Sequence, residues 1–251
     1  MLRYVLPATL FLSALSAQAQ LTMDDFAAIW LFNEDGKDVS ENEYHAELKN
    51  GAKIENGSLM LDGASWAEMP NQAAFQAQGG ITLLARVFPT TINREDAFFA
   101  HMILAKGNEY LLRIDPPDQG NLFAAFFYVN EDWRPAAAEV KPEENVWAFV
   151  AATYEPTEGD EMNVKLYVDG KLKAQANRKG KILTTDNLVE IGRWEDFSYF
   201  IGAIDEAAIM KRPATEEEIR LIHKTGLEGF SQGLNVEPTG RLAVSWGELK
   251  A

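Results

Sequence analysis

Three aromatic side chains lie in polar segments of the sequence, where a place in a hydrophobic core is hard to arrange. Trp133 belongs to the segment NEDWRP, and Trp194 and Tyr199 belong to RWEDFSYF, which connects two expected strands. Exposed tryptophan and tyrosine rings can stack on sugar rings and bury their apolar C–H surface. The sequence therefore predicts a ligand-binding surface that includes Trp133, Trp194 and Tyr199.

The alternative for Trp133 and Trp194 is packing in the core or at the edge of the domain, and the sequence leaves this open. Trp66 follows the Asp62-Gly63 turn and is a further aromatic residue beside a loop. Trp30 and Trp147 stand inside apolar runs, so we expect both in the core.

Charge and composition exclude several classes of function. Acidic residues outnumber basic ones 38 to 23 among the 251 residues, which gives a formal charge of -15. A field of this sign repels phosphate backbones and anionic headgroups, so nucleic acid and membrane surfaces are poor partners. The sequence has no cysteine and only 3 histidines, so neither disulfides nor a multi-histidine metal centre is expected.

The first 19 residues read as a secretory signal peptide. Arg3 precedes an apolar stretch over residues 4–15, and AQA at residues 17–19 offers small side chains at the cleavage position. The stretch is shorter than the ~20 residues of a bilayer span, and a membrane anchor is the alternative. We expect cleavage before Gln20, a secreted or periplasmic protein without membrane insertion, and a mature charge of -16 once Arg3 is lost.

The middle of the chain reads as antiparallel β-structure. Short apolar or alternating runs recur with turn signals between them, and helical periodicity is rare, so long βαβ crossovers are not available. An all-β sandwich of two antiparallel sheets is the remaining architecture. The expected strands are Phe26–Phe32, Ser58–Asp62, Ile81–Phe88, Phe98–Ala105, Tyr110–Ile114, Leu122–Val129, Val146–Tyr154, Asn163–Val168, Lys171–Ala176, Val189–Gly192 and Gly202–Met210.

The clearest local unit is a hairpin over residues 163–176. Asp169-Gly170 suits a two-residue type I′ turn, because both residues tolerate positive φ angles. The alternation predicts that Val164, Leu166 and Val168 share a face with the returning residues Leu172, Ala174 and Ala176.

One helix is predicted over Thr215–Lys224. Thr215 and Glu218 have the spacing of a capping box, and Gly226 is expected to end the helix. We expect one domain over residues 20–226, followed by a C-terminal extension over residues 227–251.

Seven segments follow one another in a recognisable order: IWLFNEDGKDVSENEYHAEL, SLMLDGASWAEMP, ITLLARVFPT, VWAFVAATYE, VKLYVDGKLKAQ, VEIGRW and GAIDEAAIMKRPATEEEIRLIH. Together they resemble the laminin-G-like, concanavalin A-like jellyroll domains of secreted bacterial proteins, over residues 26–223. The resemblance implies a two-sheet jellyroll that binds carbohydrate or protein ligands, often with a calcium ion, and that is usually not catalytic.

The resemblance also implies where calcium would bind. The segment DVSENEYHA over residues 38–46 is similar to the family's Asp-x-Ser-Gly-Asn-Gly-Asn-x-Gly loop, although its glycines are replaced here. In the family, calcium lies between this loop and the strand that resembles residues 202–206. The implied ligands are Asp38, Asn42, Asp205 and the main-chain carbonyl of His45. The alternative is that Asp38 and Asn42 cap turns.

Motifs of common hydrolases are absent from the sequence. The Glu-x-Asp-x-x-Glu pattern of laminarinase-type jellyroll glucanases does not occur, nor do Gly-x-Ser-x-Gly or His-Glu-x-x-His. We therefore expect a secreted, non-catalytic recognition module that binds glycan or another extracellular ligand, with a structural calcium ion. A glycan-active hydrolase of the same fold and a structural module that contacts a partner protein are the alternatives.

Overall fold

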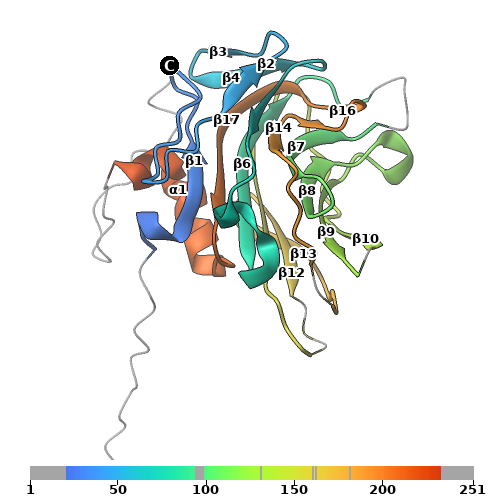
Figure 1. The fold of residues 1–251 in the computed structure, drawn as a ribbon. Helices are drawn as coiled ribbons and strands as arrows, with labels where there is room; N and C mark the ends of the chain where they lie inside the picture. Colours follow the sequence, from blue (N-terminus) through green and yellow to red (C-terminus); the bar gives the residue numbers. More distant parts are fainter. Residues whose placement is uncertain are drawn as a thin grey trace, which may run out of the picture.

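The computed structural model describes residues 21–93, 99–130, 132–159, 161, 163–180 and 182–232. Two antiparallel sheets pack face to face over these residues, and an α-helix covers the outside of one of them (Figure 1). This confirms the predicted two-sheet sandwich with a C-terminal helix. The expected signal peptide, and residues 233–251 of the expected C-terminal extension, lie outside the described residues.

Sheet A has the strand order β13-β12-β11-β6-β17-β4-β3, and β1 also pairs with β17. Its long central strands correspond to the apolar runs of the sequence. The bounds are β1 Phe26–Trp30, β3 Lys53–Glu55, β4 Ser58–Asp62, β6 Ile81–Pro89, β11 Ala148–Tyr154, β12 Val164–Val168, β13 Lys171–Ala176 and β17 Ile201–Met210.

Sheet B has the order β10-β9-β8-β7-β14-β5-β2, and a small hairpin, β15–β16, lies against β7. The bounds are β2 Glu47–Lys49, β5 Trp66–Met69, β7 His101–Lys106, β8 Tyr110–Ile114, β9 Phe123–Val129, β10 Asp132–Ala137, β14 Val189–Ile191, β15 Arg193–Trp194 and β16 Ser198–Tyr199. Single 3-10 turns cover Met23–Asp25, Ala73–Phe75, Ala77–Gly79 and Pro117–Gln119.

The main core lies between the two sheets. Successive side chains of a strand point to opposite sides, so Leu83 and Val87 of β6 enter this core while Leu84 points outward. Leu104 and Leu112 of sheet B meet them from the other side. Trp30 is fully buried in this core, as predicted.

The helix α1 (Glu216–Ser231) covers the outer side of sheet A. Thr215 and Glu218 form the predicted capping box: Thr215 Oγ1 accepts from the Glu218 N–H at 3.2 Å, and the Thr215 N–H donates to Glu218 Oε2 at 2.8 Å. Ile219 and Ile222 are buried against the sheet in the same apolar cluster as Leu84. Helix and sheet therefore share a second, smaller core.

Gly226 interrupts the helix, as predicted, and a second helical segment follows it. Gly226 has φ 71°, a left-handed value that glycine adopts easily, and it kinks α1. The helix then continues to Ser231, because Leu227 is fully buried and the Phe230 ring packs on Phe26 with 5.3 Å between centroids. The first residues beyond the kink are thus packed on the sandwich.

The predicted hairpin is confirmed in its turn and corrected in its register. Asp169 (φ 50°) and Gly170 (φ 70°) both have the positive angles of a type I′ turn. A bulge between Leu166 and Tyr167 shifts the pairing, so Leu172 faces the outward-pointing Tyr167 and is 37% exposed. Leu172 therefore does not share the core face, because one inserted residue reverses side-chain direction.

Among the residues that the structure describes, no helix has the length and hydropathy needed to cross a bilayer.

Candidate functional site

The outer side of sheet B carries the aromatic residues that the sequence singled out. Trp133 lies on β10 and Trp194 on β15, and their ring centroids are 6.1 Å apart in an edge-to-face arrangement. Both side chains are half-buried and pack on a small apolar cluster of sheet B: Met102, Ala105, Leu111, Ala124 and Phe126. The structure thus brings Trp133 and Trp194 together from distant parts of the sequence.

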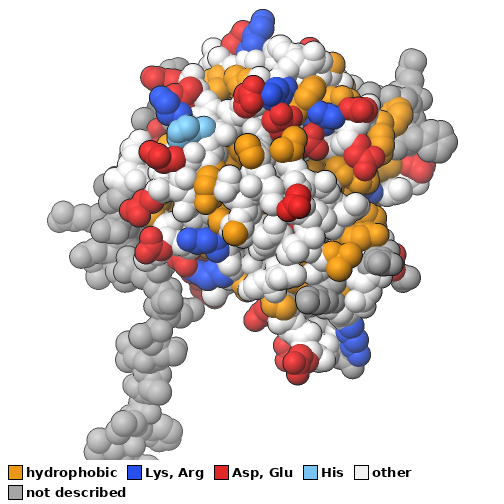
Figure 2. Space-filling view, in the orientation of Figure 1, with side chains coloured by type: hydrophobic (Ala, Val, Ile, Leu, Met, Phe, Trp, Pro, Cys, Tyr) orange, Lys and Arg blue, Asp and Glu red, His pale blue; other side chains and the backbone are white. Residues whose placement is uncertain are grey.

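Further rings enlarge this pair. Tyr128 on β9 lies 4.8 Å from the Trp133 ring, and Phe197 lies 5.6 Å from the Trp194 ring with 40% of its surface exposed. Figure 2 shows apolar side chains gathered at the right-hand edge of the molecule, near the position of β16 in Figure 1, with charged side chains beside them. We call this surface the aromatic face; its residues are Trp66, Phe126, Tyr128, Trp133, Trp194, Phe197 and Tyr199.

Tyr199 belongs to a second group on the aromatic face. Its ring packs on Trp66 of β5 with 6.2 Å between centroids. The Arg193 guanidinium lies 4.1 Å from the Trp66 centroid, and Arg193 and Tyr199 are paired across the β15–β16 hairpin. The three predicted residues therefore lie in two groups, Trp133 with Trp194 and Tyr199 with Trp66.

Two glutamates lie beside these rings. Glu68 on β5 and Glu190 on β14 are directly opposite each other in the strand register. Their chain neighbours Ala67 and Val189 point into the core, so both glutamates point to the outer side of sheet B. The face therefore combines apolar rings with carboxylates that can accept hydrogen bonds from a ligand.

The environment of Glu190 changes its acidity. Burial raises the pKa of Glu190 to about 7; Arg193 opposes this rise, and the nearby Glu68 carboxylate adds to it. Arg193 Nη1 lies 3.4 Å from Glu190 Oε1, and the glutamate side chain is only 13% exposed. Glu190 therefore changes its charge near neutral pH, beside the aromatic face.

Glu68 has firmer partners. Trp66 Nε1 donates to Glu68 Oε2 at 2.8 Å, and Lys49 Nζ lies 3.2 Å from Glu68 Oε1. The Trp66 ring is thus fixed at its edge by Glu68 and on its face by Arg193.

The indole nitrogen of Trp194 is a buried donor without an acceptor among the residues that the structure describes. It lies over the backbone of Gly107, where an added Cβ would come within 3.6 Å of Nε1. An unmade hydrogen bond at a buried donor costs about 1–3 kcal/mol. A ligand oxygen or a water molecule is the kind of group that would satisfy it.

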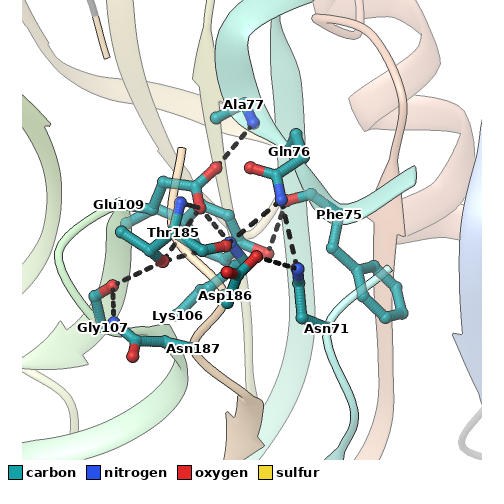
Figure 3. Close-up of polar contacts among 11 residues, drawn as sticks. Asn71, Phe75, Gln76, Ala77, Lys106, Gly107, Glu109, Thr185, Asp186 and Asn187 are labelled. Carbon is teal, nitrogen blue, oxygen red and sulfur yellow. Dashed lines mark hydrogen bonds and ion pairs between the residues drawn. The ribbon is translucent and has the colours of Figure 1, made fainter. Parts of the chain in front are cut away.

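A buried ion pair holds the β7–β8 turn on which the Trp194 ring lies (Figure 3). Lys106 Nζ pairs with the Glu109 carboxylate across the β7–β8 turn, and both side chains are fully buried. Lys106 Nζ also donates to the Thr185 carbonyl at 2.7 Å, and Glu109 Oε1 accepts from the Ala77 N–H at 3.0 Å. These bonds fix the turn that contains Gly107, and hence the surface on which Trp194 rests.

Arg113 lies at another border of the aromatic face. Its guanidinium stands 4.0 Å from the Phe126 ring centroid, and its Nε donates to Asp115 Oδ1 at 2.8 Å. Its Nη2 donates to Gln119 Oε1 at 2.9 Å. Fixed polar groups therefore lie at the border of the rings, as they do in many ligand sites.

The residues of the expected calcium loop do not fit a calcium ion. Asp38 Oδ1 accepts from the N–H groups of Ile29 and Ser40 at 2.9 and 2.8 Å. Asp38 Oδ2 accepts from Ser40 Oγ and the Tyr44 N–H at 2.8 and 2.9 Å. Calcium needs oxygen lone pairs, and here donors of the chain already occupy those of Asp38.

Asn42 also has a structural role. Its Nδ2 donates to the carbonyls of Phe26 and Ala27 at 3.1 and 3.0 Å. Together with Asp38, which accepts from the Ile29 N–H, it satisfies backbone groups along β1 that no neighbouring strand pairs. The loop thus protects a free sheet edge.

The other two expected ligands are Asp205 and the main-chain carbonyl of His45. His45 Nδ1 accepts from the Asp38 N–H at 3.2 Å, while the Asp205 carboxylate, at a bulge of β17, lies 3.8 Å from Arg86 Nε. No group of three or more His, Asp and Glu side chains that could hold a metal ion occurs in the described ranges. The contacts of Asp38 and Asn42 favour the turn-capping alternative, while calcium binding by Asp205 and the His45 carbonyl stays a prediction.

Trp147 corrects a further expectation. It lies just before β11, exposes 36% of its surface and packs on Phe88 of β6 at 5.2 Å, with Arg86 5.4 Å from its centroid. The sequence predicted a core position because Trp147 lies in an apolar run. The strand β11 begins only at Ala148, so Trp147 precedes the buried part of that run. Trp147 is thus an exposed tryptophan on sheet A, away from the aromatic face.

Sequence reasoning missed part of the site. Tyr128 and Phe126 lie in an apolar run that reads as buried strand, and nothing in their spacing reveals which of them points outward. Glu190 and Arg193 are the two charged residues of the VEIGRW segment, and the sequence alone does not show that they form an ion pair at a ligand site. Their partnership depends on β14 and β5 being neighbours, which no local pattern shows.

Solved structures share this fold at low sequence identity. Domain 4 of AbnA, a GH43 extracellular arabinanase from Geobacillus stearothermophilus solved in complex with arabinotriose, is 17% identical with a TM-score of 0.61. That match covers 79% of this chain and 98% of the arabinanase domain.

Toxin binding domains are similar as well. The botulinum neurotoxin serotype D ligand binding domain, solved with N-acetylneuraminic acid, is 14% identical with a TM-score of 0.58, and the match covers 81% of this chain and 52% of that one. The binding domain of botulinum neurotoxin DC, solved with rat synaptotagmin II, is 11% identical with a TM-score of 0.59, at 80% and 51% coverage. This chain spans about half the length of those toxin chains.

No curated protein matches the chain. Residues 61–220, more than half of the sequence, match the family described as the concanavalin A-like lectin/glucanases superfamily. The strands that this match spans form both sheets of the sandwich. The chain therefore belongs to the concanavalin A-like lectin/glucanases superfamily.

Proposed function

We propose that this protein is a secreted, non-catalytic recognition module that binds a glycan on the aromatic face. The observation that carries the proposal is the placement of Trp133 and Trp194, which lie 6.1 Å apart on an outer sheet surface and stay partly exposed. Half-buried indole rings of this kind offer flat apolar surface to a sugar ring. Secretion rests on the signal-peptide pattern of residues 1–19.

Polar groups around the rings support a sugar ligand. Glu68 and Glu190 lie beside the rings on the outer side of sheet B and can accept hydrogen bonds from hydroxyl groups. A few such groups among apolar ones fix the orientation of a small ligand. The arabinanase domain of the same fold was solved with arabinotriose, which shows that a fold of this kind can hold an oligosaccharide.

The charge of the protein narrows the class of glycan. The chain carries a formal charge of -15, so polyanionic chains such as sulfated or uronate-rich glycans are repelled over the whole surface. Neutral oligosaccharides with an apolar ring face are the ligands that the aromatic face suits. The proposal includes no calcium ion, because the carboxylate oxygens of Asp38 are occupied by donors of the chain.

Isothermal titration against neutral oligosaccharides, chosen from a glycan array, tests this proposal. Trp133→Ala and Trp194→Ala should each weaken binding about 5- to 150-fold, if stacking of a sugar ring is worth the ~1–3 kcal/mol that one aromatic side chain contributes to stacking of a nucleobase. Trp147→Ala removes an exposed tryptophan of sheet A and is the matched control. Equal affinity of all three variants and the wild type would refute the proposal.

A glycan-active hydrolase is the second candidate, and the Glu68–Glu190 pair favours it. Directly opposed residues of antiparallel strands have Cβ atoms about 4.5–5.5 Å apart, and a carboxylic acid with a pKa near 7 can act as a general acid. Both carboxylates already hold partners of the chain, Lys49 and Arg193, which is why we rank binding first. New reducing ends that disappear in Glu190→Gln would reverse this order.

A further inference from the structure

The β15–β16 hairpin carries Trp194 and Tyr199 but is only a few residues long. An isolated two-stranded hairpin is marginally stable at best, so its position depends on contacts with the sheet below it. Arg193 makes several of these contacts at once. Its position at the start of the hairpin lets it connect the hairpin to β5 and β14.

Arg193 contacts both the sheet and its own hairpin. Towards the sheet, its guanidinium stacks at 4.1 Å on Trp66, and its Nη1 lies 3.4 Å from Glu190 Oε1. Within the hairpin, its Nε donates to the Glu195 carbonyl at 2.7 Å, and its Nη2 donates to Asp196 Oδ1 at 2.6 Å. Arginine suits this task because its planar fork can stack and donate several bonds together.

We propose that Arg193 is the positioning residue of the aromatic face and that its ion pair with Glu190 makes ligand binding depend on pH. The proposal rests on the glycan-binding function proposed above. When Glu190 is ionised, it holds Arg193 against Trp66 and so fixes the hairpin that presents Trp194 and Tyr199. When Glu190 is protonated, this ion pair is lost, and the hairpin keeps its internal bonds, the contacts with Trp66 and the packing of Trp194 on sheet B.

The charged groups around Glu190 define the range in which it titrates. Glu68 of β5 and Asp196 of the hairpin raise its pKa, and Arg193 and the Glu195 N–H lower it. Lys49 of β2 pairs with Glu68, while β7 presents the uncharged Ala105 opposite Glu190. Burial is the largest influence, and the resulting pKa is about 7.

The size and the sign of the expected effect follow from this value. The ionised fraction of Glu190 is about 0.9 at pH 8 and about 0.1 at pH 6. The apparent Kd for a neutral oligosaccharide should therefore rise up to about tenfold when the pH is lowered from about 8 to about 6. Protonation of a buried carboxyl whose pKa is raised favours the folded state, so the melting temperature should not fall over the same interval. Weaker binding at pH 6 without loss of stability would distinguish protonation of Glu190 from acid unfolding of the protein.

Titration calorimetry of wild type, Glu190→Gln and Arg193→Ala at pH 6, 7 and 8 tests the proposal. Glu190→Gln should bind weakly and equally at every pH, Arg193→Ala should behave alike, and Arg193→Lys should recover part of the affinity. Arg220→Ala, which removes an exposed arginine of α1, is the control and should keep the wild-type pH profile. A pH profile that survives in Glu190→Gln would overturn the proposal.

The NMR signals of the tryptophan indole N–H groups provide a readout that needs no ligand. The Trp66 and Trp194 signals should shift with a midpoint near pH 7 in the wild type and stay constant in Glu190→Gln. Constant signals in the wild type would overturn the positioning role even if glycan binds. Shifting signals without any glycan binding would instead support the positioning role of Arg193 and contradict the proposed function.

Discussion

Asp38 stands in a sequence pattern that is compatible with both calcium binding and turn capping. An aspartate followed by serine and asparagine at short spacing is typical of calcium loops, and equally of turns that aspartate caps. The structure gives its carboxylate four hydrogen bonds, two per oxygen, from Ile29, Ser40 and Tyr44. The same loop, with Asn42, closes the free edge of β1.

The first prediction concerns this loop. Because chain donors occupy the Asp38 carboxylate, melting curves recorded with calcium and with a chelator should coincide. Asp38→Asn removes one charged acceptor and should lower the melting temperature by several degrees in both buffers, since bonds to a buried charged group are worth about 1.5–3 kcal/mol. A wild-type curve that rises several degrees with calcium would show that the loop rearranges to bind the ion.

At the residue scale, the sequence predicted part of the site for a clear reason. Trp133 and Trp194 were identified because polar neighbours make a core position costly, and both are indeed partly exposed. Trp147 was misplaced because its apolar neighbours hide that it precedes β11. Pairs such as Arg193 with Trp66 depend on strand order, which one-dimensional spacing does not encode.

At the scale of elements, alternation and turn chemistry predicted the long strands, each of which is present within a few residues. The short strands β2, β3 and β5 were missed because three or four residues are too few for a periodic pattern. β10 was missed because Asp132 and Pro135 within it are unfavourable in strands. It forms an edge of sheet B, where such residues are tolerated.

The second prediction concerns the β7–β8 hairpin. Lys106→Met leaves the Glu109 carboxylate buried without its cation, which should lower the unfolding free energy by about 3–5 kcal/mol. The double variant Lys106→Met with Glu109→Gln removes both charges and should recover part of this loss. Urea denaturation measures both values, and a double variant that is no more stable than the single one would contradict the buried-pair account.

The same variants connect this element to function. Since the turn at Gly107 supports Trp194, the single variant should also bind glycan more weakly than its folded fraction explains. Binding that is unchanged per folded molecule would show that the support is not needed.

At the scale of the whole molecule, two buried glutamates set a dependence of stability on pH. Burial raises the pKa of Glu206 to about 7, with Asp205 adding to the rise, against a usual value of 4.5. Its Oε2 accepts from the Leu227 N–H at 3.0 Å, so it lies between sheet A and α1. Glu190 shows a rise of the same size on sheet B.

The third prediction follows from the sign of these shifts. Between pH 4.5 and about 7 the folded state binds more protons than the unfolded state, so the contribution to stability is lost as pH rises through 7. Burial lowers the pKa of His223, which acts in the opposite sense below its usual value of 6.5. The unfolding free energy should therefore be compared between pH 6.5 and 8.5.

Over that interval the wild type should lose on the order of 1 kcal/mol for each of the two glutamates. Glu206→Gln should lose about half as much, because Glu190 still titrates in this variant and position 206 no longer does. Urea unfolding at the two pH values measures the difference, and a wild type that is more stable at pH 8.5 would contradict the assignment.

We propose the aromatic face of sheet B as the glycan-binding surface of the molecule. This proposal is tested most directly by following the indole N–H signals of the 6 tryptophans while a neutral oligosaccharide is added. The signals of Trp66, Trp133 and Trp194 should shift in a saturable way, while those of the buried Trp30 and the exposed Trp147 of sheet A should not. Shifts confined to Trp147, with the aromatic face unchanged, would contradict the proposal.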